Sequence, residues 1–329
     1  MQQHRRGLIV KGLAATALAL TGGWSYSQEA FPSKPMKIIV PFPPGGLADN
    51  LVRGTAQEMT SVLGQPVLIE NRPGANTIIA AQATARAPAD GYTLLMANDP
   101  TVSMNQYLYS KLPYDPVADL IPVINVAETL EVLVVGPAFK GKTLSDLLAE
   151  AKASPGTVTY GSYGPGSKAH IDAESFAKIA GVKLLHVPYK GVADVVPALL
   201  SGQVQMAFTG LPPVAQVVKS GKLRAIAVAA PKRSSMLPEV PTFAEVGLPN
   251  FNSSAWFGLV APTGTPRAHV DKIAQTVSRI IVKPDFQQKY ITGVGLELLN
   301  QGPDEFAEHL KKDRTMYGAY INELGIKLD

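Results

Sequence analysis

The chain of 329 residues contains no cysteine. This absence excludes disulfide bonds, cysteine-ligated zinc, iron–sulfur clusters, thiol nucleophiles and the lipid-bearing cysteine of a lipoprotein. Charged residues are also scarce, at 17% of the chain, compared with about 25% in an average soluble protein. The hydrophobic content of 46% is ordinary for a protein with buried cores, so the length predicts a folded protein of about two domains.

Positive charge is not concentrated on the folded part of the chain. The formal net charge is +4, but Arg5, Arg6 and Lys11 stand in the first 27 residues without any acidic residue, which leaves +1 for the remainder. A surface that binds nucleic acid through its phosphates requires a clustered excess of basic residues. We therefore expect no nucleic-acid partner.

Motifs of catalysis and metal binding are missing as well. There is no H-E-x-x-H, no histidine cluster at metal-ligand spacing and no G-x-S-x-G nucleophile elbow. His170 follows Ser167 by three residues, a spacing that is more typical of helix capping than of catalysis. We expect no enzyme activity, no metal and no cofactor. The five histidines are His4, His170, His186, His269 and His309.

The N-terminus has the pattern of a secretory signal peptide over residues 1–27. Arg5 and Arg6 precede an apolar run from Gly7 to Leu20, which is too short for the roughly 20 residues that span a bilayer. Small residues follow, and we expect cleavage near Ser27/Gln28 and a soluble exported product. The arginine pair also fits a twin-arginine signal, and an uncleaved membrane anchor is a further alternative.

After the signal, short β-rich runs alternate with amphipathic stretches of helical length, which predicts parallel sheets covered by helices. Two such β-α-β-α sets are present, and each requires its own core. The expected strands are 37–42, 67–71, 92–97, 132–135, 158–160, 184–187, 204–208 and 223–229, and the helices between them are 48–63, 77–86, 143–153, 170–179, 195–200 and 214–220.

The C-terminal region predicts an extended run at 255–261 followed only by helices, at 267–282, 285–293 and 303–324. Helices without strands of their own need an existing sheet, so we expect this tail to pack on the first domain. The chain then crosses twice between two lobes, through hinges near 127–131 and 230–254.

The predicted fold is α/β, with lobe 1 formed by residues 28–128 plus 254–329 and lobe 2 by residues 129–253. Ligands of open α/β sheets bind outside the carboxyl ends of the strands, so a cleft between the lobes is the expected binding site.

Residues 136–143 match the P-loop pattern G-x-x-x-x-G-K-[ST] between a strand and a helix. Pro137, however, removes one of the backbone N–H groups that such a loop must supply. Thr143 and Asp146 are better explained as a helix N-cap with its acidic partner. We therefore interpret this segment as a capped helix.

Residues 164–169 match G-x-G-x-x-A, which raises the possibility of dinucleotide binding. The next strand ends in Lys190 instead of the acidic residue that would bind a ribose, which argues against it. The glycines still allow the backbone to approach a ligand closely, and the N–H groups at the start of the helix attract an anion. Ser167 can add a hydroxyl donor.

The segment from Pro43 to Asp49 has the equivalent position in the first domain. Two lobes that each present a glycine-rich helix start suggest that one small carboxylate is held from both sides. Alternatively, Gly45 and Gly46 only form a tight turn, and Asp49 is an N-cap that pairs with Arg53. The sequence favours neither explanation.

Eight motifs in order from about Lys34 to the C-terminus resemble the substrate-binding proteins of tripartite tricarboxylate transporters, the Bug or TctC-like family. The motifs lie at 39–49, 64–67, 70–75, 90–95, 112–116, 186–191, 238–249 and 256–266.

The resemblance implies a two-lobe periplasmic binding protein of type II, or Venus-flytrap, architecture with two hinge crossovers. Such a protein captures a small carboxylate-containing compound and delivers it to the permease subunits of a tripartite tricarboxylate transporter. We expect a monomer in the periplasm. A sensor that presents its closed form to a membrane receptor kinase is the alternative.

The same resemblance transfers the family's ligand loops onto this chain. Phe42, Tyr189 and Thr209 flank these loops and complete the expected site. Two departures from the family are Tyr163 with Pro165, where small residues are common, and Thr209, where many members carry an aspartate that suits an ammonium group. The loop residues are Gly45, Gly46, Ala48 and Asp49 in the first lobe and Tyr163, Gly164, Ser167 and His170 in the second.

Overall fold

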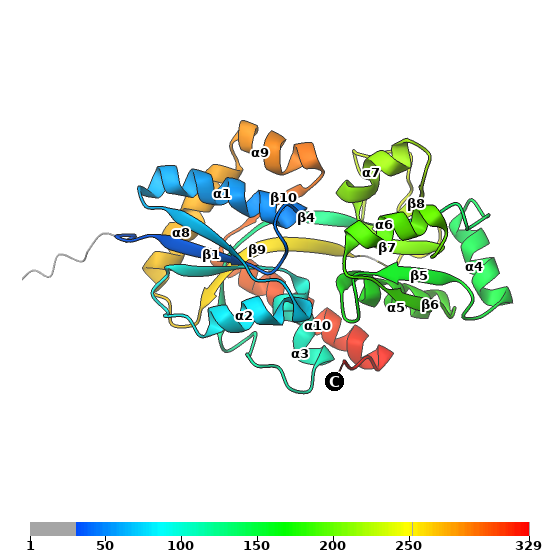
Figure 1. Ribbon diagram of the computed structural model, residues 1–329, viewed down its shortest axis with the longest axis horizontal. Coiled ribbons are helices and arrows are strands. Elements are labelled where there is room, and N and C mark those ends of the chain that lie inside the picture. Colours follow the sequence, from blue (N-terminus) through cyan, green and yellow to red (C-terminus); the bar gives the residue numbers. More distant parts are fainter. Residues whose placement is uncertain (1–30, 252, 329) are drawn as a thin grey trace, which may run out of the picture. The chain divides into compact units, whose positions relative to one another are not determined.

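The computed structural model describes residues 31–251 and 253–328. The predicted signal peptide and its cleavage site lie outside this part of the chain. From Lys34 onward the chain forms one compact unit of α/β architecture (Figure 1). No helix among the described residues is long and apolar enough to cross a membrane.

The first β-α-β-α set is confirmed. Three parallel strands with β1 in the middle alternate with two helices, because the five residues of β1 are almost entirely buried and α1 buries one apolar face. These elements are β1 (Met36–Val40), α1 (Leu47–Leu63), β2 (Val67–Asn71), η1 (Ala75–Thr77), α2 (Ile78–Ala85), β3 (Thr93–Ala97), η2 (Pro100–Met104) and α3 (Asn105–Leu108).

The second set is confirmed too, with β5 between β6 and β7 in parallel pairing. Its elements are α4 (Leu144–Ala153), β5 (Thr159–Ser162), α5 (Lys168–Ala180), β6 (Leu185–Pro188), α6 (Val192–Ser201), β7 (Met206–Gly210), α7 (Leu211–Lys219) and β8 (Arg224–Val228).

One strand belongs to both sets. β4 (Leu120–Val135) is 16 residues long, although the sequence predicted a strand only at 132–135 and a hinge strand near 127–131. The hinge strand predicted near 230–254 is wrong, because residues 230–251 contain no strand and the second crossover is β9. Up to Leu130 it pairs with β9 (Ser254–Pro262), and from Glu131 onward it pairs with β7. We call the strands on the first side sheet A (β2-β1-β3-β9-β4, with β10) and those on the other side sheet B (β4-β7-β5-β6, with β8).

The C-terminal tail packs on sheet A as expected, but it is not purely helical. α8 (Arg267–Ile281) packs against α1 and β4, and it is followed by α9 (Pro284–Tyr290) and η3 (Thr292–Val294). The missed strand β10 (Glu297–Gln301) pairs antiparallel with β4.

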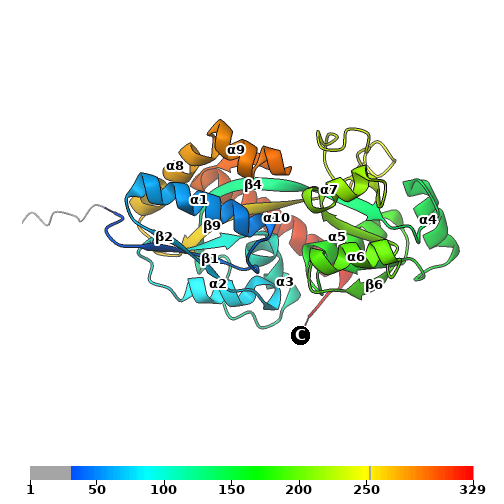
Figure 2. The same ribbon diagram turned by 45° about the horizontal axis from the view of Figure 1, so that its top comes forward.

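The last helix, α10 (Pro303–Leu324), contacts elements of both sheets. It packs against β4 and η2 and also against α5, the helix that follows β5 of sheet B. Met104, Leu108, Ile171, Tyr317 and Ile321 form one small buried cluster, to which α5 contributes Ile171. Figures 1 and 2 show β4 and β9 running between the two groups of elements and α10 extending from one group to the other.

Candidate functional site

The first predicted loop, between β1 and α1, is closed by Asp49. Its Oδ2 accepts hydrogen bonds from Gly45 N (2.9 Å) and Arg53 Nε (2.8 Å), and its Oδ1 accepts one from Asn71 Nδ2 (2.7 Å). Burial alone would raise the pKa of Asp49, but the hydrogen bonds from Arg53, Asn71 and Gly45 lower it below its ordinary value. The pairing with Arg53 is therefore present, but the alternative that made Asp49 the N-cap is wrong, because Gly46 is the N-cap and Asp49 lies in the first turn of α1. Both carboxylate oxygens of Asp49 are engaged within the protein.

The tip of this loop is exposed backbone. Gly45 has φ +90°, a conformation that favours glycine, whereas Gly46 has φ −76° and caps α1 without a side chain. A side-chain carbon added at either glycine would have no atom within 4 Å. Ala48 is buried in the first turn of α1, and Phe42 is half-buried, with its carbonyl bonded by Asn71. The glycines are thus the part of the loop that a ligand can reach.

The second predicted loop, between β5 and α5, uses most of its own amides. Gly164 N donates to Ser162 Oγ (3.1 Å), Gly166 N to His170 Nδ1 (3.0 Å) and Ser167 N to Gly164 O (3.2 Å). Ser167 caps α5 by accepting from His170 N (3.4 Å). The donors that remain are the Ser167 hydroxyl and the amides of Lys168 and Ala169 at the start of α5, which have no partner within their own helix.

His170 lies behind this loop and is packed against the rings of His186 and Tyr160. It is 8% exposed, and its ring stacks on that of His186 with centroids 4.2 Å apart. Tyr160 stacks on His186 at 4.9 Å and also lies nearly parallel to His170, at 6.4 Å. Burial lowers the pKa of both histidines to about 4, so both are neutral at neutral pH. The ligand contact predicted at His170 stays a prediction, and the structure shows that its Nδ1 accepts a hydrogen bond from the loop backbone.

The remaining predicted site residues lie near the second loop. Thr209 is 1% exposed, at the end of β7 opposite Val132 of β4. Tyr163 is half-buried beside it, with its hydroxyl 3.5 Å from Phe208 O. Burial and the nearby Glu131 raise the pKa of Tyr163, so it stays protonated. Tyr189 donates to Gln203 from the strand end of β6.

The sequence missed a turn that connects sheet A to the second loop. Asn76 Nδ2 donates to Gly166 O (3.1 Å) and to Asn105 Oδ1 (2.8 Å). Ala75, Asn76 and Thr77 all have positive φ, at 46°, 47° and 75°. Such backbone is rare outside glycine and asparagine, and it persists only where surrounding contacts enforce it. No hydrogen bond among the described residues joins the first loop directly to the second.

A second missed feature is a buried charge cluster centred on Lys168. Lys168 Nζ bonds both carboxylate oxygens of Asp172 (2.6 and 2.8 Å) and the hydroxyl of Ser253. Lys168 is 7% exposed and Asp172 is 4% exposed. Burial would lower the pKa of Lys168, but Asp172, Glu131 and Asp99 raise it above its ordinary value, so the ammonium stays charged. The i, i+4 spacing of Lys168 and Asp172 was the available sequence signal.

Three more acids complete this cluster. Glu131 lies on β4 and is 3% exposed, and its Oε2 has no hydrogen-bond partner. Asp99 follows β3, is 1% exposed and accepts from Tyr317 Oη at 3.0 Å. Asp313 on α10 accepts from Trp256 Nε1 at 2.6 Å. The acids and Lys168 therefore come from both sheets and from α10.

The P-loop match is a helix cap, as the sequence predicted. Asp146 N donates to Thr143 Oγ1 (3.2 Å), and Asp146 Oδ2 accepts from Lys142 N (2.8 Å) and Thr143 N (3.0 Å). These bonds form a capping box at the start of α4. The amides that would hold a phosphate are therefore committed to Asp146.

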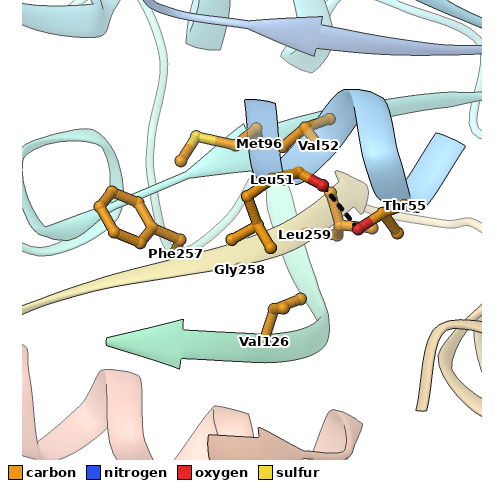
Figure 3. Close-up of a pocket in the computed structure, with 8 residues that line it drawn as sticks. All are labelled: Leu51, Val52, Thr55, Met96, Val126, Phe257, Gly258 and Leu259. Atoms are coloured by element: carbon orange, nitrogen blue, oxygen red, sulfur yellow. Dashed lines mark hydrogen bonds between the residues drawn. The ribbon is translucent and has the colours of Figure 1, made fainter. Parts of the chain in front are cut away.

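A small pocket beneath α1 is not a candidate for carboxylate binding. It is lined by Leu51, Val52 and Thr55 of α1 and by residues of β3, β4 and β9 (Figure 3). Its volume of about 10 Å³ is at the lower limit for one water molecule. The Thr55 hydroxyl already donates to Leu51 O. In the described part of the chain, no three His, Asp or Glu residues are grouped to hold a metal ion.

With this geometry established, comparison with known proteins identifies the family. The model of the tripartite tricarboxylate transporter family receptor, TctC, matches residues 51–326. The chain belongs to this family. BugT of Bordetella pertussis is 35% identical over 310 residues, covering 92% of this chain and 93% of BugT. The resemblance found from the sequence motifs is thereby confirmed, and the TctC family is a family of solute-binding receptors.

Two solved structures are similar over almost their whole length. A protein of Rhodopseudomonas palustris solved with adipate is 31% identical, with a TM-score of 0.83, and the match covers 91% of this chain and 100% of that one. MatC of the same organism, solved with bound malate, is 30% identical, with a TM-score of 0.80 and coverage of 88% and 100%. This TctC-family chain has the predicted two-lobe fold of periplasmic binding proteins.

Proposed function

We propose that this TctC-family protein is a non-catalytic, monomeric periplasmic receptor that captures a small carboxylate-bearing solute and delivers it to the permease subunits of a tripartite tricarboxylate transporter. The ligand binds between lobe 1 (residues 28–128 and 254–329) and lobe 2 (residues 129–253). β4 and β9 form the two crossovers, and ligand closes the lobes by a hinge motion.

The observation that carries this proposal is the pair of equivalent glycine-rich turns. Each follows the carboxyl end of a parallel strand, β1 or β5, and each leads directly into a helix, α1 or α5. Strand ends of this kind are where open α/β folds bind ligands, and helix N-termini favour anions. The adipate and malate of the two similar structures support a carboxylate as the ligand class.

A thermal-shift screen tests the proposal. Mono-, di- and tricarboxylates and aromatic acids are added to the mature protein, with adipate and malate as the first probes. A ligand at 100 times its dissociation constant stabilises the folded state by about 2.7 kcal/mol. We expect at least one small carboxylate to raise Tm, with amides and esters of the same skeleton as controls. If no carboxylate stabilises the protein, the proposed ligand class is wrong.

We predict that Gly46→Val weakens ligand binding by about ten-fold or more, with only the small loss of stability expected for valine at an N-cap. Valine fits the free loop, because φ is −76° and no atom lies within 4 Å, but it blocks the exposed backbone. Gly302→Val is a matched control, since Gly302 caps α10 with similar backbone angles and equally open space. Calorimetry should show a loss of affinity for Gly46→Val alone. Equal affinities in both variants would remove the first loop from the site.

We predict that Ser167→Ala weakens binding by roughly ten- to a hundred-fold, because one hydrogen bond to a charged group is lost. The substitution also removes the α5 cap, which contributes about 1 kcal/mol of stability. Thr143→Ala removes the cap of α4 and controls for that effect. A titration in which both variants bind like the wild type would show that the Ser167 hydroxyl does not contact the ligand.

A further inference from the structure

Two histidines, His170 and His186, form hydrogen bonds that constrain the second loop. The loop contains Gly164 with φ +111° and Gly166 with φ +73°. Glycine at such angles has many alternative conformations, so a defined loop shape requires outside constraints. The hydrogen bonds to these two residues show where the constraints come from.

His170 fixes Gly166. A backbone N–H can only donate, so the bond from Gly166 N to His170 Nδ1 (3.0 Å) requires Nδ1 to be unprotonated. The neutral ring then carries its proton on Nε2. On the other side of the same peptide segment, Asn76 Nδ2 donates to Gly166 O. Gly166 is thus held at both its amide and its carbonyl.

His186 fixes Gly164 through Ser162. The Ser162 hydroxyl, which is fully buried, lies 2.6 Å from His186 Nε2. The same oxygen accepts from Gly164 N (3.1 Å) and lies 3.2 Å from Gly164 O. The imidazole therefore orients the hydroxyl that closes the turn.

The two rings support each other. His170, His186 and Tyr160 stack with interplanar angles of 10° and 12°, and Tyr160 Oη donates to Glu174 Oε1. Tyr160 and Glu174 are the titratable groups that face this pair from β5 and α5. A charge on either imidazole would be buried next to the other ring, which disfavours protonation.

We propose that His170 and His186 are positioning residues, which turn the Gly164 and Gly166 amides inward so that the Ser167 hydroxyl and the amides of Lys168 and Ala169 are left to bind the ligand. This inference rests on the proposed function for its ligand but not for its geometry. Acid that protonates His170 replaces the Nδ1 acceptor by a donor, releases Gly166 and weakens binding.

The geometric part is tested without ligand. Nitrogen NMR of the wild-type protein at pH 7 should show His170 with its proton on Nε2, and hydrogen exchange at the Gly166 amide should be slow. A ring proton on Nδ1, or a Gly166 amide that exchanges like an exposed one, overturns the proposal. The measurement does not depend on any variant folding.

Variants separate positioning from simple packing. His170→Phe keeps a flat stacked ring but has no acceptor, whereas the Oδ1 of His170→Asn can occupy the position of Nδ1. We expect exchange at Gly166 to become about ten-fold faster, and affinity for the acid found in the screen about ten-fold weaker, in His170→Phe. His170→Asn should recover most of both. Equal behaviour of the two variants overturns the positioning role.

The pH profile gives a further test. Affinity of the wild type should decline as the pH falls toward 4, where His170 becomes protonated. The decline should be smaller in His170→Asn, which keeps His186 but has no titrating group at position 170. A wild-type profile identical to that of His170→Asn contradicts the inference. If no acid binds the wild type at any pH, the proposed function fails, while the NMR and exchange results still decide the positioning role.

Discussion

Replacing Lys168 with methionine should destabilise the protein by about 3–5 kcal/mol, because it leaves a buried carboxylate without its counter-charge. Lys168 Nζ is bonded to both oxygens of Asp172 and to Ser253. Methionine preserves most of the side-chain volume, so the loss is mainly electrostatic. At about 2–4 °C per kcal/mol for a chain of this size class, Tm should fall by roughly 10 °C.

Lys178→Met is the matched control. Lys178 lies on the same helix and pairs with Glu323, but both side chains are largely exposed, at 42% and 62%. An exposed pair contributes about 0–1 kcal/mol. The double variant Lys168→Met, Asp172→Leu should recover part of the lost stability, because it removes the uncompensated charge as well. A Lys168→Met protein as stable as Lys178→Met would show that the buried pair contributes little.

The stability of the protein should decrease as the pH rises from about 6.5 to 8.5. Burial, together with neighbouring acids, raises the pKa of Asp99 and of Glu131 to about 8. In the unfolded chain such carboxyls lose their protons near pH 4. Between these values the folded state binds more protons than the unfolded state, so stability falls with rising pH, by about 1.4 kcal/mol per pH unit for each extra proton.

The predicted decrease in stability begins near pH 6.5, because below this pH the two histidines make stability rise with pH. The pKa of His170 and of His186 is lowered to about 4 in the folded protein, whereas unfolded histidine titrates near 6.5. Between these values the unfolded state binds more protons through the histidines, so their contribution to stability is lost as the pH falls. Above 6.5 only the carboxyl effect remains.

Thermal denaturation at constant ionic strength measures this slope. Glu131→Gln should flatten it, since glutamine resembles the protonated carboxyl and does not titrate. Glu70→Gln is the control, because the hydrogen bond from Lys37 lowers the pKa of the half-buried Glu70, which therefore does not titrate in this range. A Tm that is constant or rises to pH 8.5 in the wild type contradicts the prediction.

Local patterns in the sequence predicted most of the fold, and non-local pairing explains the errors. The Thr143 cap and the helix at Pro303–Leu324 were predicted correctly, because their signals lie within a few residues of each other. β4 was predicted only in part, because polar residues such as Asn125 and Glu128 interrupt its apolar run. These positions are extended because β9 and β10 pair with them.

The same distinction applies to the candidate site. The two glycine-rich loops are short contiguous segments, so their sequence predicted a turn, a helix start and exposed backbone. The charge cluster could not be found in this way, because Asp99, Glu131, Lys168 and Asp313 are separated by about 30 residues or more along the chain. Only the sheet crossover through β4 and the packing of α10 bring them together. His170 is an intermediate case, because its place on the second loop was visible in the sequence but its hydrogen bond to Gly166 was not.

The shared strand β4 also determines which changes of length the protein can accept. Leu133 and Val135 point toward the core that contains Phe176, whereas Val132 and Val134 point toward the core that contains Leu199. Side chains alternate along a strand, so inserting a single residue after Leu130 would turn the side chains of residues 131–135 to the opposite face of sheet B while leaving the part of β4 in sheet A unchanged. We therefore expect relatives of this protein to differ within this strand by substitution and not by insertion or deletion.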